Sequence, residues 1–257
     1  MWKLGVLIAA ASLGGCNSGP DEAFAFAITT VCERTKPVSS APPGYAATWK
    51  ESIKAVEARY ANDADFSRVM REQVNRLRRD YYRGDGGEEH ASFETIDYAG
   101  SLEVTQDLTA ASPDILSVSM RALFYEAGMS HPNGVGASTL IWSRRWHRPL
   151  TQGDVFEVPP DRALRRLALS RFDNPDGLQN PDDPDGIPLP WDRASIGPDG
   201  ITWFFDSYEL GGYAAAGSAT IGWPALMPYL RPELPFVIGE VREGPGILRK
   251  PRPGGCA

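Results

Sequence analysis

The sequence predicts an α+β fold in which two small antiparallel sheets follow one another along the chain, each packed against a helix. A long amphipathic helix is indicated over residues 64–83, and strand-like runs follow it over 92–110, 115–128 and 137–147. A second helix is predicted over 159–172, ahead of two further strands. We therefore expect one sheet-and-helix unit in each half of the chain.

The elements of the N-terminal half follow from composition and periodicity. Residues 24–35 are typical of a strand because alternating and β-branched residues dominate. Residues 36–46 form a loop rich in Pro, Ser and Gly, and 47–60 are expected to form a weaker helix. Within 64–83, apolar residues recur at steps of three and four. They are Phe66, Val69, Met70, Val74, Leu77 and Tyr81. The opposite face is rich in arginine; a partner patch is possible there, but a solvated helix face explains it better.

Alternation and turn residues define the next elements. In 115–128, the apolar residues at every second position are expected to face one way. They are Leu116, Val118, Met120, Ala122 and Phe124. Pro160 and Asp161 begin the second helix. The loop 173–190 is rich in Asp, Pro and Gly, but placing Gly186 at the invariant glycine of a calcium-binding EF-hand loop puts Pro181 at its first ligand position. We therefore predict no metal site and no cofactor, with calcium in this loop as a weaker alternative.

The last part of the chain is predicted to hold two strands and a helical turn. The strands are expected at 201–206 and 218–222, and Pro224 is expected to start a short helical turn over 224–230. Residues 243–257 contain three prolines and four glycines and are expected to be an irregular tail.

The first fifteen residues are typical of an export signal. Lys3 precedes an apolar run that is shorter than the ~20 residues of a membrane-spanning helix. The run ends in Leu13, two glycines and Cys16, an order that resembles the lipobox of bacterial lipoproteins. That resemblance implies a lipid on Cys16, with residues 16–23 as a tether; the alternative is an ordinary signal peptide with an incidental cysteine.

Cys32 and Cys256 are then the remaining cysteines, one near each end of the exported chain. An exported protein lies in a compartment where disulfides persist, so we expect the two to pair. Chain-entropy models assign such a long loop roughly 5 kcal/mol, and often less in practice. Two unpaired thiols are the alternative.

The charge of the chain excludes one class of partner. Its formal net charge is −7 and it has no dominant run of Lys or Arg, so nucleic acid binding is not expected. We expect the lipid on Cys16 to be the membrane attachment.

Two stretches of the second half resemble a known family. The first is RALFYEAGMSHPNGVGASTLIWSRRWHRPLTQGDVF, residues 121–156. The second carries Trp203-Phe204-Phe205, Tyr208-Glu209-Leu-Gly, Tyr213-Ala214, Gly217 and Trp223-Pro224. Together they are similar to the C-terminal domain of the RsiV-type extracytoplasmic family, in which the outer domain of an anti-sigma factor binds lysozyme. The upstream part resembles the small domain that precedes it there and in PdaC-like proteins.

The resemblance implies a domain division and has departures. It implies an N-terminal small domain over 24–127 and a C-terminal domain over 128–242. The family usually has Gly-Gly-Ala-His where this chain has Gly128-Met129-Ser130-His131, and Gly-Pro-Tyr where it has Gly211-Gly212-Tyr213. The sigma-binding segment and transmembrane helix of RsiV have no counterpart, so an anti-sigma role is not implied.

The candidate chemical groups favour binding over catalysis. His131 has no neighbouring nucleophile or metal-ligand motif, and Asp206 and Glu209 stand too close together in sequence for a pair of catalytic carboxylates across a cleft. Tyr and Pro in loops suit protein recognition, because Tyr gives rigid amphipathic contact area. The candidate binding residues are Pro132, Asn133, Tyr208 and Tyr213.

We therefore expect a lipid-anchored binding or sensing protein of the cell envelope that is not an enzyme. Its partner would be a lysozyme-like hydrolase or peptidoglycan, and its acidity would suit a basic protein. The alternative is a hydrolase, or a protein associated with a deacetylase, that acts on cell-wall glycan. Asn17 after the lipidated cysteine resembles lipoproteins sorted to the outer membrane, facing the periplasm.

Overall fold

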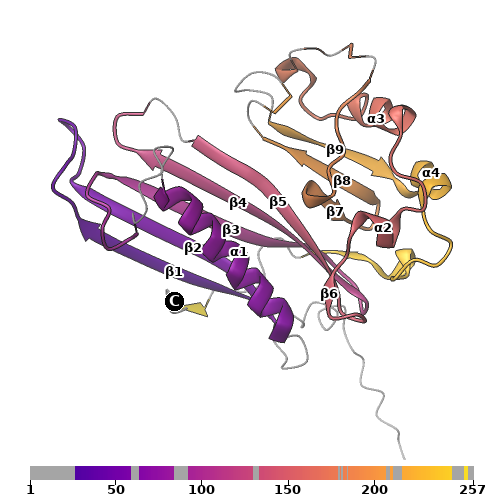
Figure 1. The fold of residues 1–257 in the computed structure, drawn as a ribbon, viewed down its shortest axis with the longest axis horizontal. Helices are drawn as coiled ribbons and strands as arrows, with labels where there is room; N and C mark the ends of the chain where they lie inside the picture. Colours follow the sequence, from indigo (N-terminus) through magenta and orange to yellow (C-terminus); the bar gives the residue numbers. More distant parts are fainter. Residues whose placement is uncertain are drawn as a thin grey trace, which may run out of the picture.

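The structure is a computed structural model, and it places most of the chain in two packed sheets (Figure 1). It describes residues 27–58, 64–83, 92–129, 133–178, 180, 182–183, 185–206, 209–210, 216–244 and 252–253. The expected signal peptide, Cys16 and the tether lie outside the described residues, as do His131, Pro132, Tyr208, Tyr213 and Cys256.

The larger sheet has eight strands. Its order is β11–β1–β2–β3–β4–β5–β6, and β10 also pairs with β3. The strands are β1 (Ala27–Pro37), β2 (Thr48–Ala58), β3 (Gly100–Ala111), β4 (Ile115–Glu126), β5 (Asn133–Ser143), β6 (Arg148–Pro149), β10 (Arg242–Glu243) and β11 (Arg252–Pro253). Two pairs, β2 with β3 and β1 with β11, are parallel, and the others are antiparallel. The expectation of purely antiparallel sheets is therefore wrong for this sheet.

The helix α1 (Ala64–Arg83) joins the two parallel strands β2 and β3 and lies across one face of the sheet. Its bounds and its apolar stripe are those that the periodicity predicts, since Phe66, Met70 and Val74 are buried. Gln106 on β3 is also fully buried. Its amide nitrogen donates to the Met70 carbonyl at 3.1 Å, and its oxygen accepts from the backbone N–H of Val56 on β2. This side chain ties helix and sheet together.

The prediction of a weak helix over 47–60 is wrong, because this segment is the strand β2. Trp49, Glu51 and Ile53 alternate inward, as a strand requires. Two features conceal that alternation. The apolar residues Trp49, Ile53 and Val56 are also spaced like one face of a helix, and the inward position between the first two holds a charged residue.

The smaller sheet packs on the other face of the larger one. Its strands are β7 (Ala194–Ile196), β8 (Gly200–Phe205) and β9 (Gly217–Gly222), in that order. The helices α2 (Gln152–Val155), α3 (Arg162–Leu169) and α4 (Trp223–Leu226) accompany it, with 3-10 turns at Pro175–Gly177, Trp191–Arg193, Met227–Tyr229 and Ile238–Glu240. Ala110, Ile115 and Ile141 of the larger sheet belong to the same buried cluster as this layer. The α+β class is thus observed, but the two units share a core instead of forming separate helix-packed sheets.

Hydroxyl groups line the contact between the two sheets. The Ser195 hydroxyl on β7 lies 2.7 Å from that of Thr109 and 3.0 Å from that of Ser117. Thr139 on β5 donates to the Ala194 carbonyl at 2.5 Å. These directional bonds fix how β7 sits on β3, β4 and β5.

Two expected segment limits differ from the observed elements. The boundary at 127/128 falls between β4 and β5, which are hydrogen-bonded neighbours in one sheet. The larger sheet continues to β6, so the second layer begins only after Pro149. The tail expected to be irregular contains residues of β10 and the whole of β11, because these short strands pair with β3 and β1.

Candidate functional site

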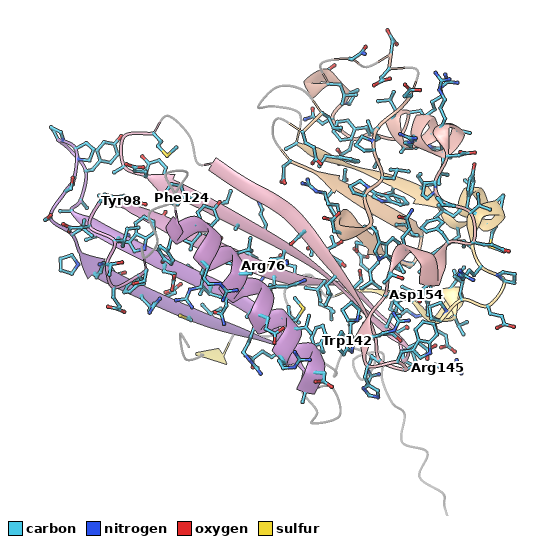
Figure 2. The ribbon with its side chains drawn as sticks, in the orientation of Figure 1. Arg76, Tyr98, Phe124, Trp142, Arg145 and Asp154 are labelled. Carbon is cyan, nitrogen blue, oxygen red and sulfur yellow. The ribbon has the colours of Figure 1, made fainter. Side chains whose placement is uncertain are left out.

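The larger sheet has two ends that differ in the residues they expose. We call the end where β1 begins the proximal end; it also holds the β3–β4 turn (112–114) and the β5–β6 turn (144–147), because Ala27 pairs with Ala58 and Ile115 with Ser143. The opposite, distal end holds the β1–β2 loop (38–47) and the end of β4. In Figure 2, Tyr98 and Phe124 mark the distal end, and Arg145 marks the proximal end.

Two tyrosines and two tight turns form the surface of the distal end. Tyr45 is 44% exposed and is hydrogen-bonded to Tyr125, a bond that raises the pKa of the Tyr125 hydroxyl. Gly44 and Gly128 have φ of +89° and +102°, which glycine adopts readily. A Cβ on Gly128 would lie 3.5 Å from Cγ of Pro42, so the two loops touch. The loops thus hold the tyrosine pair in a fixed position.

An aromatic cluster lies at the same end of the sheet, on the face that α1 covers. Trp49 is fully buried; its ring lies 5.5 Å from the ring of Tyr98 and 5.9 Å from that of Phe124, and Tyr81 stacks on Phe124 at 5.2 Å. Burial raises the pKa of Tyr98, with a further contribution from the charge of Glu126. Packed rings with few rotatable bonds make this end of the sheet and the end of α1 rigid.

A buried carboxylate holds α1 against the strands below the distal end. Glu51 is 1% exposed, and its Oε1 accepts hydrogen bonds from Arg34 Nη2 at 2.6 Å and Nε at 2.9 Å. Its Oε2 accepts from the Tyr82 hydroxyl at 2.6 Å and from Arg78 Nε at 3.2 Å. Burial, followed by the bond to Glu51, raises the pKa of Tyr82. Both carboxylate oxygens are occupied by these donors, so the cluster is a structural one.

Exposed acidic groups lie in the segments that reach the distal end, although Glu94 is paired with Arg34 at 3.7 Å. Glu94, Asp97 and Glu126 are all exposed. Hydrogen bonds from the Ser39 hydroxyl and backbone N–H, the latter at 2.7 Å, lower the pKa of Asp97, so this carboxylate is charged at neutral pH. The distal end therefore combines tyrosine, proline and negative charge.

Of the predicted binding residues, Asn133 lies within the described chain. It begins β5 and pairs with Phe124, which places it at the distal end. Pro132, Tyr208 and Tyr213 lie outside the described residues, so their roles stay predictions. Tyr45 and Tyr125 were missed; the Pro-Pro-Gly-Tyr sequence of 42–45 is a turn signal followed by an aromatic residue, and it could have marked the first of them.

Asp206 and Glu209 are joined by one arginine. Arg193 Nη1 lies 3.3 Å from Asp206 Oδ2 and also bonds Glu209 Oε2, which accepts the backbone N–H of Asp206 at 3.1 Å. This arrangement closes the turn after β8 and uses the charges in an ion cluster. The pKa of Tyr81 is raised mainly by burial and then by the charge of Asp206, so this turn lies near the distal end of α1.

Within the described ranges, no three His, Cys, Asp or Glu side chains gather in a way that would hold a metal ion. In the same part of the chain, no helix combines the length and apolar character needed to cross a bilayer.

Cys32 lies next to the last strand of the sheet. Thr30 and Val31 of β1 pair in parallel with Arg252 and Pro253 of β11, and Cys32 follows them, 6% exposed. The Cys32 sulfur is not a free thiol. Cys256 comes three residues after Pro253, and three residues span at most ~10 Å.

Two solved structures share this fold. A DUF3298 family protein from Pseudomonas aeruginosa PAO1 aligns with a TM-score of 0.59 at 14% sequence identity, over 80% of this chain and 94% of that one. A member of the same family from Bacteroides fragilis NCTC 9343 aligns with a TM-score of 0.54 at 14% identity, over 83% of this chain and 96% of that one. Identity this low supports a common fold and nothing finer. No protein-family model matches the sequence, and no curated protein sequence does either.

Proposed function

We propose that this chain is an exported protein, anchored by a lipid on Cys16, that binds a partner in the cell envelope through the distal end of its larger sheet. It acts as a binding or sensing protein and not as an enzyme. The observation that carries this proposal is the distal surface itself, where the exposed Tyr45 is hydrogen-bonded to Tyr125. Rigid tyrosines lose little conformational entropy on binding, which is why they are frequent in recognition surfaces.

The charge of this surface favours a basic partner. Asp97 and Glu126 are exposed at the distal end, and the whole chain carries a formal net charge of −7. Complementary charge speeds association and selects the partner. A lysozyme-like hydrolase, as in the RsiV-type family that the sequence resembles, is therefore the first candidate, and peptidoglycan is the second.

Binding to immobilised lysozyme and to purified peptidoglycan tests the proposal. We expect the wild-type protein to be retained on lysozyme at low salt and less at high salt. The double variant Tyr45→Ala, Tyr125→Ala should bind at least ~30-fold more weakly, as for tyrosines at the centre of an interface. Met227→Ala is the matched control, because Met227 is 58% exposed but lies in the second layer.

Two outcomes would contradict the proposal. If the double variant Tyr45→Ala, Tyr125→Ala and the control Met227→Ala lose the same amount of affinity, the distal end is not the binding surface. Absence of retention together with turnover of muropeptides would favour the alternative, a hydrolase or deacetylase-associated protein acting on cell-wall glycan.

The lipid anchor is tested separately. Replacing Cys16 by Ala should release the protein from the membrane fraction into the soluble fraction of the envelope, since the thioether that carries the lipid can no longer form. Unchanged retention of Cys16→Ala in the membrane fraction would contradict the lipobox assignment. The same fractionation, with the outer membrane separated from the inner, tests the expected location in the outer membrane.

We also propose that Cys32 pairs with Cys256. The parallel register of β1 and β11 supports it, because it brings the chain to within three residues of Cys256 beside Val31, and Cys32 is the next residue after Val31. Such a bond would close the edge of the larger sheet at β11.

A further inference from the structure

The turn between β5 and β6 concentrates positive charge around an exposed tryptophan. Its sequence is Arg144-Arg145-Trp146-His147-Arg148, which we call the hairpin tip. Trp146 is 42% exposed, and the guanidinium of Arg148 lies 4.9 Å from its ring centre. Arg145 is exposed and makes no hydrogen bond or ion pair within the described part of the chain. In a chain with a net negative charge, this is a local reversal of sign.

The tip is held in shape by its own hydrogen bonds. The Trp146 backbone N–H donates to the Ser143 hydroxyl at 3.1 Å, and the Arg144 backbone N–H donates to the Asp114 carbonyl at 2.7 Å. Arg144 Nη1 also donates to the Pro113 carbonyl at 3.0 Å. His147 has a φ of 50°, in the left-handed region, which closes the turn. These contacts hold the backbone of the turn that presents the exposed Trp146 ring.

The acidic groups nearest the tip leave much of its charge in place. Asp154 binds Arg148 through two hydrogen bonds, at 2.7 and 2.9 Å, and so cancels that charge. Asp114 is half-buried in the adjoining turn. Arg145 makes no hydrogen bond or ion pair among the described residues, so its charge remains at the tip.

The strand order puts this tip at the end of the molecule where the chain enters the fold. β1 begins at Ala27 at the proximal end, and ten residues lie between it and Cys16, a span of at most ~40 Å. The twelve-residue strand β4 has a length of about 40 Å, so the distal end is one strand length farther away. A chain anchored at Cys16 therefore holds the hairpin tip closest to the membrane.

We infer that the hairpin tip binds the surface of an anionic lipid bilayer, with Trp146 at the headgroup level and Arg145 on the phosphates. Tryptophan concentrates at membrane–water interfaces, and basic residues near an anionic leaflet add to its attraction. A single acyl chain binds membranes reversibly, so a second contact of this kind makes attachment more stable. The orientation argument depends on the proposed lipid on Cys16, but the binding itself does not.

The test uses the chain from Asn17 onward, without lipid, since the described fold begins at Ala27. It is centrifuged with vesicles of phosphatidylcholine mixed with phosphatidylglycerol, and with vesicles of phosphatidylcholine alone. We expect binding to the mixed vesicles only, weakened by salt. Arg145→Glu should lower the partition coefficient by about 30-fold, because the charge changes by two. Trp146→Ala should lower it on the mixed vesicles as well, and melting temperatures check that both variants fold.

Arg76→Glu is the matched control, because Arg76 is also exposed but lies midway along α1 (Figure 2). Its partition should change by less than about twofold, because it lies beyond the Debye length from a membrane at the proximal end. Equal binding by wild type and Arg145→Glu, or equal loss in Arg76→Glu, would overturn the inference. Failure of this test leaves the Cys16→Ala result untouched, so the tip and the lipid anchor are judged separately.

Discussion

The two ends of the larger sheet are built by the same strands but expose opposite chemistry. The proximal end carries the arginines of the hairpin tip and Trp146, whereas the distal end carries Tyr45, Tyr125 and exposed carboxylates. Since successive hairpin turns lie at alternate ends of a sheet, segments distant in sequence gather at one end and neighbours are separated. The difference in charge between the two ends therefore follows from the strand order. Residues at either end can be substituted without changing the other end.

The largest expected effect is on the stability of the Glu51 cluster that holds α1 against the strands. Glu51→Ala would leave the guanidinium groups of Arg34 and Arg78 without their buried carboxylate, and we expect a loss of about 3 kcal/mol in the free energy of unfolding. Chemical denaturation measures it. Glu103→Ala, at an exposed position of the neighbouring strand β3, should cost less than about 0.5 kcal/mol. Similar values for the two variants would show that the cluster does not hold α1 in place.

The second largest expected effect is the loss of stability when the proposed disulfide is removed. Cys256→Ser is expected to destabilise the protein by about 2–3 kcal/mol, below the chain-entropy limit for so long a loop. The comparison is with the wild type in the presence and absence of a reductant. If reduction lowers the melting temperature of the wild type but not that of Cys256→Ser, the pair forms. Identical behaviour of both proteins would mean that the two cysteines are not joined.

A smaller effect separates binding from folding at the distal end. A Cβ on Gly100 would lie 2.3 Å from the Tyr125 carbonyl oxygen and 2.8 Å from Cζ3 of Trp49. Gly100→Ala should therefore shift Tyr125 and cost about 1–3 kcal/mol in stability. At a temperature where the variant is folded, its affinity for the partner should still fall. Unchanged affinity in the folded variant would show that Tyr125 does not belong to the binding surface.

The smallest effect sharpens the proximal half of the comparison. Asp154→Asn would free the charge of Arg148, and we expect about fivefold tighter binding to anionic vesicles.

Hydrogen bonds from Arg148, with others from Thr151, hold the pKa of Asp154 below its usual range. The stabilisation is thus present above the ordinary pKa of ~4 and is lost as the pH falls toward the pKa of the folded state. A titration of melting temperature in which wild type and Asp154→Asn differ most at low pH would contradict this assignment.

The sequence predicts the parts of the fold that depend on local pattern. The helix 64–83 was found because its apolar residues repeat over five turns, and β4 because its inward residues alternate without interruption. β2 was missed because Glu51 occupies an inward position, and its neutralisation by Arg34 and Arg78 depends on contacts far along the chain.

Long-range pairing lies outside what a local pattern can predict. Nothing in the composition of a Pro- and Gly-rich tail shows that Arg252 pairs with Thr30, or that β5 continues the sheet of β4 across the expected domain boundary. At the candidate site, Asn133 was named from its loop, but the Tyr45–Tyr125 pair exists only once the strands from β1 to β4 are assembled in one sheet. The hairpin tip is visible in sequence as a basic run with a tryptophan, but its significance depends on which end of the sheet it occupies.

The parallel pairing of β11 with β1 also has a consequence for the order of folding. β1 is synthesised long before its outer neighbour β11, because Arg252 follows its partner Thr30 far along the chain. Until β11 arrives, the backbone N–H and C=O groups along that side of β1 are available to other chains, which is a known route to aggregation. Contacts between residues so far apart in sequence also form slowly. A chaperone that protects the nascent chain would therefore have most to gain from covering β1.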